Sequence, residues 1–250
     1  MARYDFRTPR LFVEAPLAAG AAPALSAAQT NYLCNVLRLS AGEGVLVFNG
    51  RDGEWQAELV RPGKKTAALR VTVRSRPQDE GGDLHYLFAP LKHARLDYMV
   101  QKAVELGVSR LQPVLTRHSQ VARINLDRMR ANAIEAAEQC GILTIPEIMA
   151  PLSLEKMLQT LAPERLLVFC DEDAALRDPG AALAAHRTGQ SAPPLAVLIG
   201  PEGGFAEEER ALLLRRNNIV QLALGPRILR ADTAAVAALA LVQTALGDWR

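Results

Sequence analysis

Residues 195–208 read Leu-Ala-Val-Leu-Ile-Gly-Pro-Glu-Gly-Gly-Phe-Ala-Glu-Glu, which is an apolar run, a glycine-rich turn and an acidic stretch. The apolar run predicts a strand buried on both faces, and the acidic stretch predicts the start of a helix. The arrangement recurs soon afterwards, because an apolar run at 219–224 leads into Gly-Pro-Arg-Ile-Leu-Arg at 225–230. Two strand-to-loop junctions so close together predict one small-molecule site built from backbone groups.

The second part of the chain alternates apolar runs with segments of helical period. Strands are expected over 85–90, 110–115, 166–170, 195–199 and 219–224, and helices over 96–106, 127–139, 206–216 and 232–246. This alternation is typical of an α/β domain with a mostly parallel sheet. Ligands bind such sheets at the carboxyl ends of the strands, where both glycine-bearing loops fall. The segment 173–194, rich in Ala, Pro and Gly, is expected to be a surface excursion.

Residues 1–76 read mostly as short strands. The runs at 44–49 and 54–60 flank Gly50-Arg51-Asp52-Gly53, which is a hairpin signal, and 67–74 alternates apolar with polar residues. One helix is expected between Ser26, its N-cap, and Arg38. These elements fit a small barrel. The polar, turn-rich segment at 76–83 marks the expected boundary between domains at 1–76 and 77–250.

Composition and charge limit the classes of protein to which this chain can belong. Of 250 residues, 49% are apolar and 22% charged, which is ordinary for a soluble globular protein. The sequence has neither a long apolar span nor a secretory leader, so we expect a cytoplasmic protein. The net charge is +2, but residues 1–76 hold 11 Lys and Arg against 6 Asp and Glu. This excess favours a polyanion contact in the first part, although an ordinary solvated surface would also produce it.

Several kinds of site are excluded by spacing. The three cysteines and four histidines lack the spacing of metal ligands, so no metal is expected. Gly200-Pro201-Glu202-Gly203-Gly204 is followed by no Gly-Lys-Ser/Thr and lacks the G-x-G-x-x-G spacing, so it is neither a P-loop nor a dinucleotide fingerprint. Ile228 and Leu229 are apolar residues within a loop. Apolar walls beside backbone hydrogen-bonding groups are what recognition of a flat heteroaromatic ring requires.

The chain resembles the SPOUT class of methyltransferases and, more narrowly, the bacterial family that methylates N3 of a uridine in small-subunit (16S) ribosomal RNA. The blocks that carry the resemblance are Gln-Lys-Ala-Val-Glu-Leu-Gly at 101–107, Ala-Ala-Glu-Gln-Cys-Gly at 136–141, Ile-Gly-Pro-Glu-Gly-Gly at 199–204, and Leu-Gly-Pro-Arg-Ile-Leu-Arg at 224–230 with Thr233. Arg7-x-x-Arg10-Leu-Phe and Val36-Leu37-Arg38 also fit. One departure is Asp232, where we expect the family to carry Glu.

The resemblance implies a small PUA-like barrel followed by an α/β domain threaded into a trefoil knot. It also implies the cofactor S-adenosylmethionine, bound by the two loops. The residues expected to bind it are Leu198, Ile199, Gly200, Pro201, Glu202, Gly203, Gly204, Leu222, Leu224, Gly225, Ile228, Leu229 and Thr233. Family members act as homodimers, and the Ala-rich last helix is compatible both with such an interface and with an ordinary core.

Methylation at N3 requires loss of the N3 proton, so the site needs a base or cationic groups that stabilise the anion. Arg230, beside the cofactor loop, is the candidate cation. Glu138 is the candidate base, or the residue that orients one, and Asp232 is the alternative. A helix-surface position or a salt bridge would also account for Glu138, and a salt bridge across a dimer would also account for Arg230.

N3 lies on the pairing edge of uracil, so the base must be unpaired or extruded from its stack. Phosphate contacts would hold the RNA. The candidates are Arg7, Arg10, Arg38, Lys92 and Arg95. The expected partner is 16S ribosomal RNA, within the small subunit.

Two other readings stay open. A non-catalytic RNA-binding protein, such as a ribosome assembly factor, would explain the basic first part but not two loops shaped for a small ligand. A knotted methyltransferase acting on tRNA, or at a ribose 2′-OH, would keep the fold and change the product.

Overall fold

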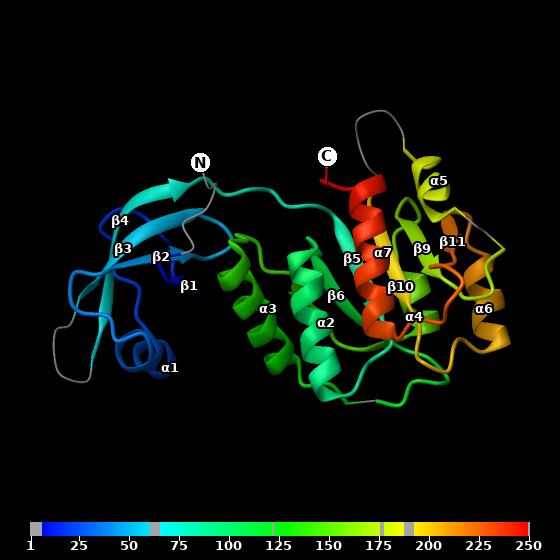
Figure 1. The fold of residues 1–250 in the computed structure, drawn as a ribbon, viewed down its shortest axis with the longest axis horizontal. Helices are drawn as coiled ribbons and strands as arrows, with labels where there is room; N and C mark the ends of the chain where they lie inside the picture. The colour runs from blue at the N-terminus through cyan, green and yellow to red at the C-terminus, as the bar shows by residue number, and fades with distance from the viewer. Residues whose placement is uncertain (1–6, 61–65, 122, 176–177, 188–192, 250) are drawn as a thin grey trace. The chain divides into compact units, whose positions relative to one another are not determined.

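The computed structural model describes residues 7–60, 66–121, 123–175, 178–187 and 193–249 (Figure 1). Its internal contacts divide the chain into two compact units. Unit 1 comprises residues 1–80 and 134–145, and unit 2 comprises residues 81–133 and 146–250. The helix α3 (Leu126–Cys140) therefore belongs to unit 2 in its first half and to unit 1 in its second half. The division of the chain into domains at 1–76 and 77–250 stays a prediction.

Unit 1 contains a four-stranded sheet in the order β1-β2-β3-β4. The strands are β1 (Arg10–Phe12), β2 (Gly44–Phe48), β3 (Glu54–Val60) and β4 (Ala68–Arg76). The predicted hairpin is confirmed, because β2 and β3 pair antiparallel on either side of residues 49–53. Ala24 pairs with Ala68, and Gly20 donates its N–H to the carbonyl of Val71. The segment that follows β1 thus pairs with β4 at the opposite edge of the sheet, as the chain of a small barrel would.

The helix predicted to end at Arg38 is a short α-helix followed by a turn of π-helix. These are α1 (Ala27–Asn31) and η1 (Tyr32–Val36). Ser26 is the N-cap, as predicted, and its Oγ accepts the N–H of Gln29 at 3.1 Å. Arg38 follows with a φ of 57°, the left-handed conformation that glycine usually adopts after a helix.

Unit 2 contains a seven-stranded sheet in which every strand pairing of the described residues is parallel. Its main path runs β11-β9-β10-β5-β6-β7, and β8 also pairs with β6. The strands are β5 (Leu84–Phe88), β6 (Arg110–Leu115), β7 (Glu147–Ile148), β8 (Leu152–Ser153), β9 (Leu166–Cys170), β10 (Leu195–Ile199) and β11 (Ile219–Leu222). The predicted parallel sheet is confirmed.

Helices cover both faces of this sheet (Figure 1). They are α2 (His93–Glu105), the first half of α3, α4 (Leu154–Thr160), α5 (Pro179–Ala184), α6 (Glu207–Leu214) and α7 (Ala231–Ala245). Met157 of α4 and Leu213 of α6 pack with Phe169 in one core cluster. On the other face α2 and α7 lie side by side, and Met99 of α2 accepts a hydrogen bond from the buried Tyr86 hydroxyl.

The four helix starts predicted for unit 2 were wrong by one to three residues, and the largest difference is at α2, which begins at His93 rather than at residue 96. The sequence predicts Asp127 as the N-cap of α3, but this helix begins at Leu126, and Asn125 accepts the N–H of Arg128. Asparagine and aspartate cap equally well, so propensity alone does not choose between them. The N-cap of α7 is Arg230, which places Asp232 inside the first turn, where the helix dipole favours a carboxylate.

Sequence patterns missed the short elements β1, β7, β8, α4 and α5. The helix α5 falls within the expected excursion at 173–194, of which residues 176–177 and 188–192 lie outside the described part of the chain. Elements this short give too few repeats for a period to be read.

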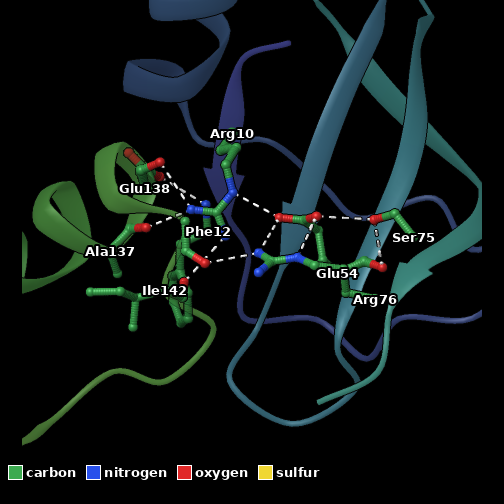
Figure 2. Close-up of polar contacts among 9 residues, drawn as sticks. Arg10, Phe12, Glu54, Ser75, Arg76, Ala137, Glu138 and Ile142 are labelled. Atoms are coloured by element: carbon green, nitrogen blue, oxygen red, sulfur yellow. Dashed lines mark hydrogen bonds and ion pairs between the residues drawn. The ribbon is translucent and has the colours of Figure 1, made fainter. Parts of the chain in front are cut away.

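The second half of α3 is held in unit 1 by a buried charge network (Figure 2). Arg10 donates from Nε to the Glu54 carboxylate at 2.8 Å, and Arg76 donates to the same carboxylate at 2.8 and 3.0 Å. The Arg10 guanidinium also donates to the carbonyls of Ala137, Glu138 and Ile142. These carbonyls lie at the end of the helix and just beyond it, where backbone acceptors lack partners within the helix. The network therefore satisfies that end of α3.

Glu54 is the one carboxylate shared by both arginines, and its side chain is only 6% exposed. Burial alone would raise the pKa of Glu54, but the hydrogen bonds from Arg76 and Arg10 outweigh burial, so the pKa lies below its ordinary 4.5. A carboxyl group with a lowered pKa stabilises the fold above its ordinary pKa, and that stabilisation is lost as the pH falls.

We predict that Glu54→Gln lowers the free energy of unfolding by about 3–5 kcal/mol, because it leaves buried guanidinium charge without a counter-charge. The wild-type chain should also lose stability more steeply than the variant as the pH falls below 4.5. Denaturant unfolding over a pH series measures both effects. Glu58→Gln is the control, because Glu58 pairs with Arg70 at an exposed position. Equal losses in the two variants would contradict the role of Glu54.

Candidate functional site

A cavity of about 370 Å³ lies in unit 2 at the carboxyl ends of β9, β10 and β11. The register of the sheet explains its position, because Ile199 pairs with Cys170 and Leu222 pairs with Cys170. All three strands thus end at one level, and the loops that follow them surround a common space. This is the edge of the sheet at which the sequence predicts a ligand.

Most of the residues predicted to bind a cofactor line this cavity. They are Ile199, Gly200, Pro201, Glu202, Gly203, Gly204, Leu222, Leu224, Gly225, Ile228 and Leu229. Leu198 does not line it, because its side chain is buried in the core beneath α4 and α6. Thr233 does not line it either; it is exposed on the first turn of α7, and its N–H donates to Asp232 Oδ1. The assignment of these residues to a cofactor stays a prediction.

Sequence reasoning missed the third wall of the cavity, which follows β9. Cys170, Asp171, Glu172 and Asp173 line it, together with Phe205, Arg210, Pro226, Arg227, Ala231 and Ala234. The loop after β9 contains no glycine, so it lacked the signal that marked the other two. The available signal was the acidic run that follows the apolar strand, since a neighbouring parallel strand ends at the same sheet edge.

Asp171 fixes this wall. Its side chain is 6% exposed, and one oxygen accepts from Arg210 Nε at 2.8 Å and from Gln221 Nε2 at 3.0 Å. Its other oxygen accepts the N–H of Asp173 at 3.2 Å. One buried carboxylate therefore joins the end of β9 to both α6 and β11. Because hydrogen bonds to charged groups are stronger than neutral ones, this joint holds the loops in place.

Gly200 allows the loop after β10 to turn over an aromatic ring. A Cβ at Gly200 would lie 2.4 Å from the ring of Phe205, which is far inside contact distance. Phe205 packs edge-on against Phe169 with 5.1 Å between the ring centroids. The ring therefore has a fixed partner beneath it, and only glycine fits above it.

Cys170 lines the cavity, but its thiol is not reactive at neutral pH. Burial, with a smaller contribution from the Asp171 charge, raises the pKa of its thiol to about 12. The thiol stays protonated at neutral pH, so it supplies no nucleophile there.

The predicted catalytic residues are divided between the units. Arg230 is exposed and lies between Leu229 and Ala231, both of which line the cavity. Asp232 is a half-buried residue two positions further along, and its Oδ2 accepts from Arg95 Nε at 3.3 Å. Glu138 belongs to unit 1, where its Oε1 accepts the N–H of Phe12 at 2.8 Å (Figure 2). Burial raises the pKa of Glu138, which the hydrogen bond from Phe12 only partly offsets.

The residues predicted to contact RNA occupy contrasting positions. Arg7 and Arg38 of unit 1 are exposed, and so is Lys92 of unit 2. Arg10 is buried, and the network around Glu54 accounts for its guanidinium. Arg95 is partly exposed and also forms an ion pair with Glu202. The exposed positions agree with contact to a polyanion, whereas Arg10 has a structural role.

Within the described residues, no group of three or more His, Cys, Asp or Glu side chains is arranged to hold a metal ion. In the same part of the chain, no helix is both long and apolar enough to span a membrane.

Comparison with known proteins gives consistent matches. Residues 78–243 match the model of an RNA methyltransferase domain, and residues 25–72 match that of an RNA methyltransferase PUA domain. The chain is 33% identical to the ribosomal RNA small subunit methyltransferase E of Synechocystis sp., over 89% of this chain and 73% of that one. The enzyme of the same name from Rickettsia conorii is 30% identical over 85% of each chain.

A solved structure extends these matches to the fold. The crystal structure of a ribosomal RNA small subunit methyltransferase E from Neisseria gonorrhoeae, bound to S-adenosyl methionine, has a TM-score of 0.86 and 28% identity. It covers 97% of this chain and 100% of its own. The fold class implied by the sequence resemblance is therefore confirmed: a PUA-like domain is followed by an α/β methyltransferase domain.

We predict that Gly200→Ala lowers the free energy of unfolding by about 1–3 kcal/mol, because the added methyl group forces Phe205 away from Phe169. Gly82→Ala is the matched control, since a Cβ there meets nothing within 4 Å. Denaturant unfolding compares the two variants. If Gly200→Ala were as stable as Gly82→Ala, the close packing of this loop would be refuted.

Proposed function

The chain belongs to the RNA methyltransferase family, and from that premise we propose that it transfers a methyl group from S-adenosylmethionine to N3 of a uridine in small-subunit (16S) ribosomal RNA. The observation that carries this proposal is the cavity at the ends of β9, β10 and β11, together with a likeness over the whole chain to an enzyme solved with this cofactor. The uridine-N3 specificity is the finer part of the proposal and rests on the motif resemblance.

The residues present fit the cofactor. A cavity of about 370 Å³ lies within the range of roughly 300–1,000 Å³ typical for small-molecule sites. Leu222, Leu224 and Leu229 supply apolar wall for an adenine ring, and the loop around Gly203 brings backbone groups to the surface of the cavity. Glu172 and Asp173 add negative charge, which suits a cofactor that carries an ammonium and a sulfonium group.

The bound cofactor supplies an activated methyl group, so the protein mainly orients the uracil and manages the N3 proton. Loss of that proton leaves negative charge on the uracil ring, and a cation beside the cofactor loop would stabilise it. We assign this role to Arg230, because it is exposed and lies between two residues that line the cavity.

Two carboxylates remain candidates for accepting the N3 proton. Glu138 has a raised pKa, which makes it a stronger base than an ordinary glutamate. Asp232 lies in the first turn of α7, close to the cavity wall, and is engaged by Arg95. Both assignments are part of the proposal.

RNA would bind through phosphate contacts on exposed cations, among which we include Arg7, Arg38 and Lys92. We further propose that the protein acts as a homodimer in the cytoplasm, on RNA within the small ribosomal subunit. Half-buried small and apolar residues on α7, including Ala237 and Leu241, provide a surface on which a second copy could pack.

Methyl transfer from labelled S-adenosylmethionine to small subunits from cells that lack this protein tests the proposal. We expect labelled 3-methyluridine after digestion of the RNA to nucleosides and mass spectrometry. Label on ribose, or on tRNA alone, would overturn the substrate. The absence of both transfer and cofactor binding would favour a non-catalytic RNA-binding protein.

We predict that Arg230→Ala lowers kcat by about 10²–10³-fold, as loss of one oxyanion-stabilising donor does, while the Kd for S-adenosylmethionine stays within a few-fold. Single-turnover transfer and calorimetry measure the two quantities. Arg215→Ala is the control, since Arg215 is an exposed arginine at the end of α6 that does not line the cavity. Wild-type turnover in Arg230→Ala would remove Arg230 from the mechanism.

Glu138→Gln in the same assay distinguishes the two carboxylates. The amide oxygen of Gln can still accept the N–H of Phe12, so the fold should be retained. A lower kcat with an unchanged free energy of unfolding would identify Glu138 as the base. An unchanged kcat would leave Asp232 as the candidate that accepts the N3 proton.

A further inference from the structure

Arg95 connects two carboxylates that belong to different parts of the candidate site. It lies in the first turn of α2, and its side chain is 32% exposed. Its Nη1 donates to Glu202 in the loop after β10, and its Nε donates to Asp232 at 3.3 Å in the first turn of α7. One guanidinium on α2 therefore contacts two other elements of unit 2, the loop after β10 and the start of α7.

The two carboxylates flank the cavity, whereas Arg95 does not line it. Glu202 lines the cavity directly, and Asp232 lies between Ala231 and Ala234, which also line it. The loop that carries Glu202 contains three glycines within residues 200–204, and glycine leaves a backbone free to adopt many conformations. An ion pair to a packed helix restrains such a loop.

The helix α2 is a firm anchor for this contact. Leu96, Met99 and Val100 are buried on its inner side, and α2 packs along α7. Without Arg95, the carboxylates of Glu202 and Asp232 would lose the cation that both of them contact. Like charges at such a place would drive the loop and the helix start apart.

We propose that Arg95 is a positioning residue of the cofactor site, which holds the Glu202 loop against the start of α7 so that the cavity is formed before the cofactor binds. This inference rests on the proposed function, because the ligand whose binding Arg95 would favour is S-adenosylmethionine. It replaces the expectation that Arg95 contacts RNA. Asp232 contributes to this positioning by accepting a hydrogen bond from Arg95.

The planar guanidinium explains why an arginine occupies this position. It presents several donors in a fixed fork, so two carboxylates from different elements can be bound at once. Lysine offers a single charged nitrogen, and it would be expected to keep one of the two pairs.

The test is the Kd of S-adenosylmethionine for Arg95→Ala, Arg95→Lys and Glu202→Gln, measured by calorimetry on the full chain. We expect Arg95→Ala to weaken binding about 10-fold, in line with the cost of disordering a preorganised site. Arg95→Lys should recover part of the loss. The double variant Arg95→Ala/Glu202→Gln should cost less than the two single losses combined, because the residues act through each other.

The effects of Arg95→Ala on kcat and on the Kd values for cofactor and RNA distinguish a positioning role from a general loss of stability. At saturating S-adenosylmethionine, kcat of Arg95→Ala should return to within a few-fold of wild type, and the Kd for RNA should be unchanged. Arg128→Ala is the matched control. Arg128 lies on α3 and pairs with Asp97, which shares the helix α2 with Arg95, and Arg128 does not line the cavity. It should leave cofactor affinity at the wild-type value.

Two results would overturn the inference. One is wild-type cofactor affinity in Arg95→Ala, whatever its melting temperature. The other is weaker RNA binding with unchanged cofactor binding, which would return Arg95 to the RNA surface. Failure of the wild-type chain itself to bind S-adenosylmethionine would instead refute the proposed function.

Discussion

The alignment of three parallel strands determines where the chemistry of this protein lies. Ile199 and Leu222 both pair with Cys170, so β9, β10 and β11 end at one level and release three loops around a common space. Buried apolar side chains on both faces of the sheet maintain that register, because a slip by one residue would turn each strand's core positions to the opposite face. Every residue of the candidate cofactor site depends on this alignment.

Charged groups connect the loops at the end of the sheet to neighbouring helices and strands. Asp171 joins the end of β9 to α6 and β11, and Arg95 joins the loop after β10 to α7. Such contacts add little when fully exposed, but partly buried pairs between separate elements reduce the motion of the loops that they connect. In unit 1 the pair of Arg10 and Glu54 acts in the same way on the end of α3. The protein thus uses ion pairs where backbone alone leaves loops and helix ends unsupported.

Sequence patterns predicted the parallel sheet, the hairpin and most of the cavity wall, because long apolar runs and glycine loops are strong local signals. They did not predict the wall at Asp171, since no glycine marks that loop. They also could not show that Arg10 is buried, because a single arginine beside a strand reads as a surface cation. The Arg95 contact joins residues more than a hundred positions apart, and no local pattern contains that information.

We expect S-adenosylmethionine to bind in the cavity formed by the loops after β9, β10 and β11. A crystal structure of the chain with S-adenosylmethionine tests it most directly. The expected result is an adenine ring against Leu222, Leu224 and Leu229, with the Gly200–Gly204 loop in contact with the ligand. Clear density for the cofactor elsewhere on the chain, with this cavity empty, would contradict it.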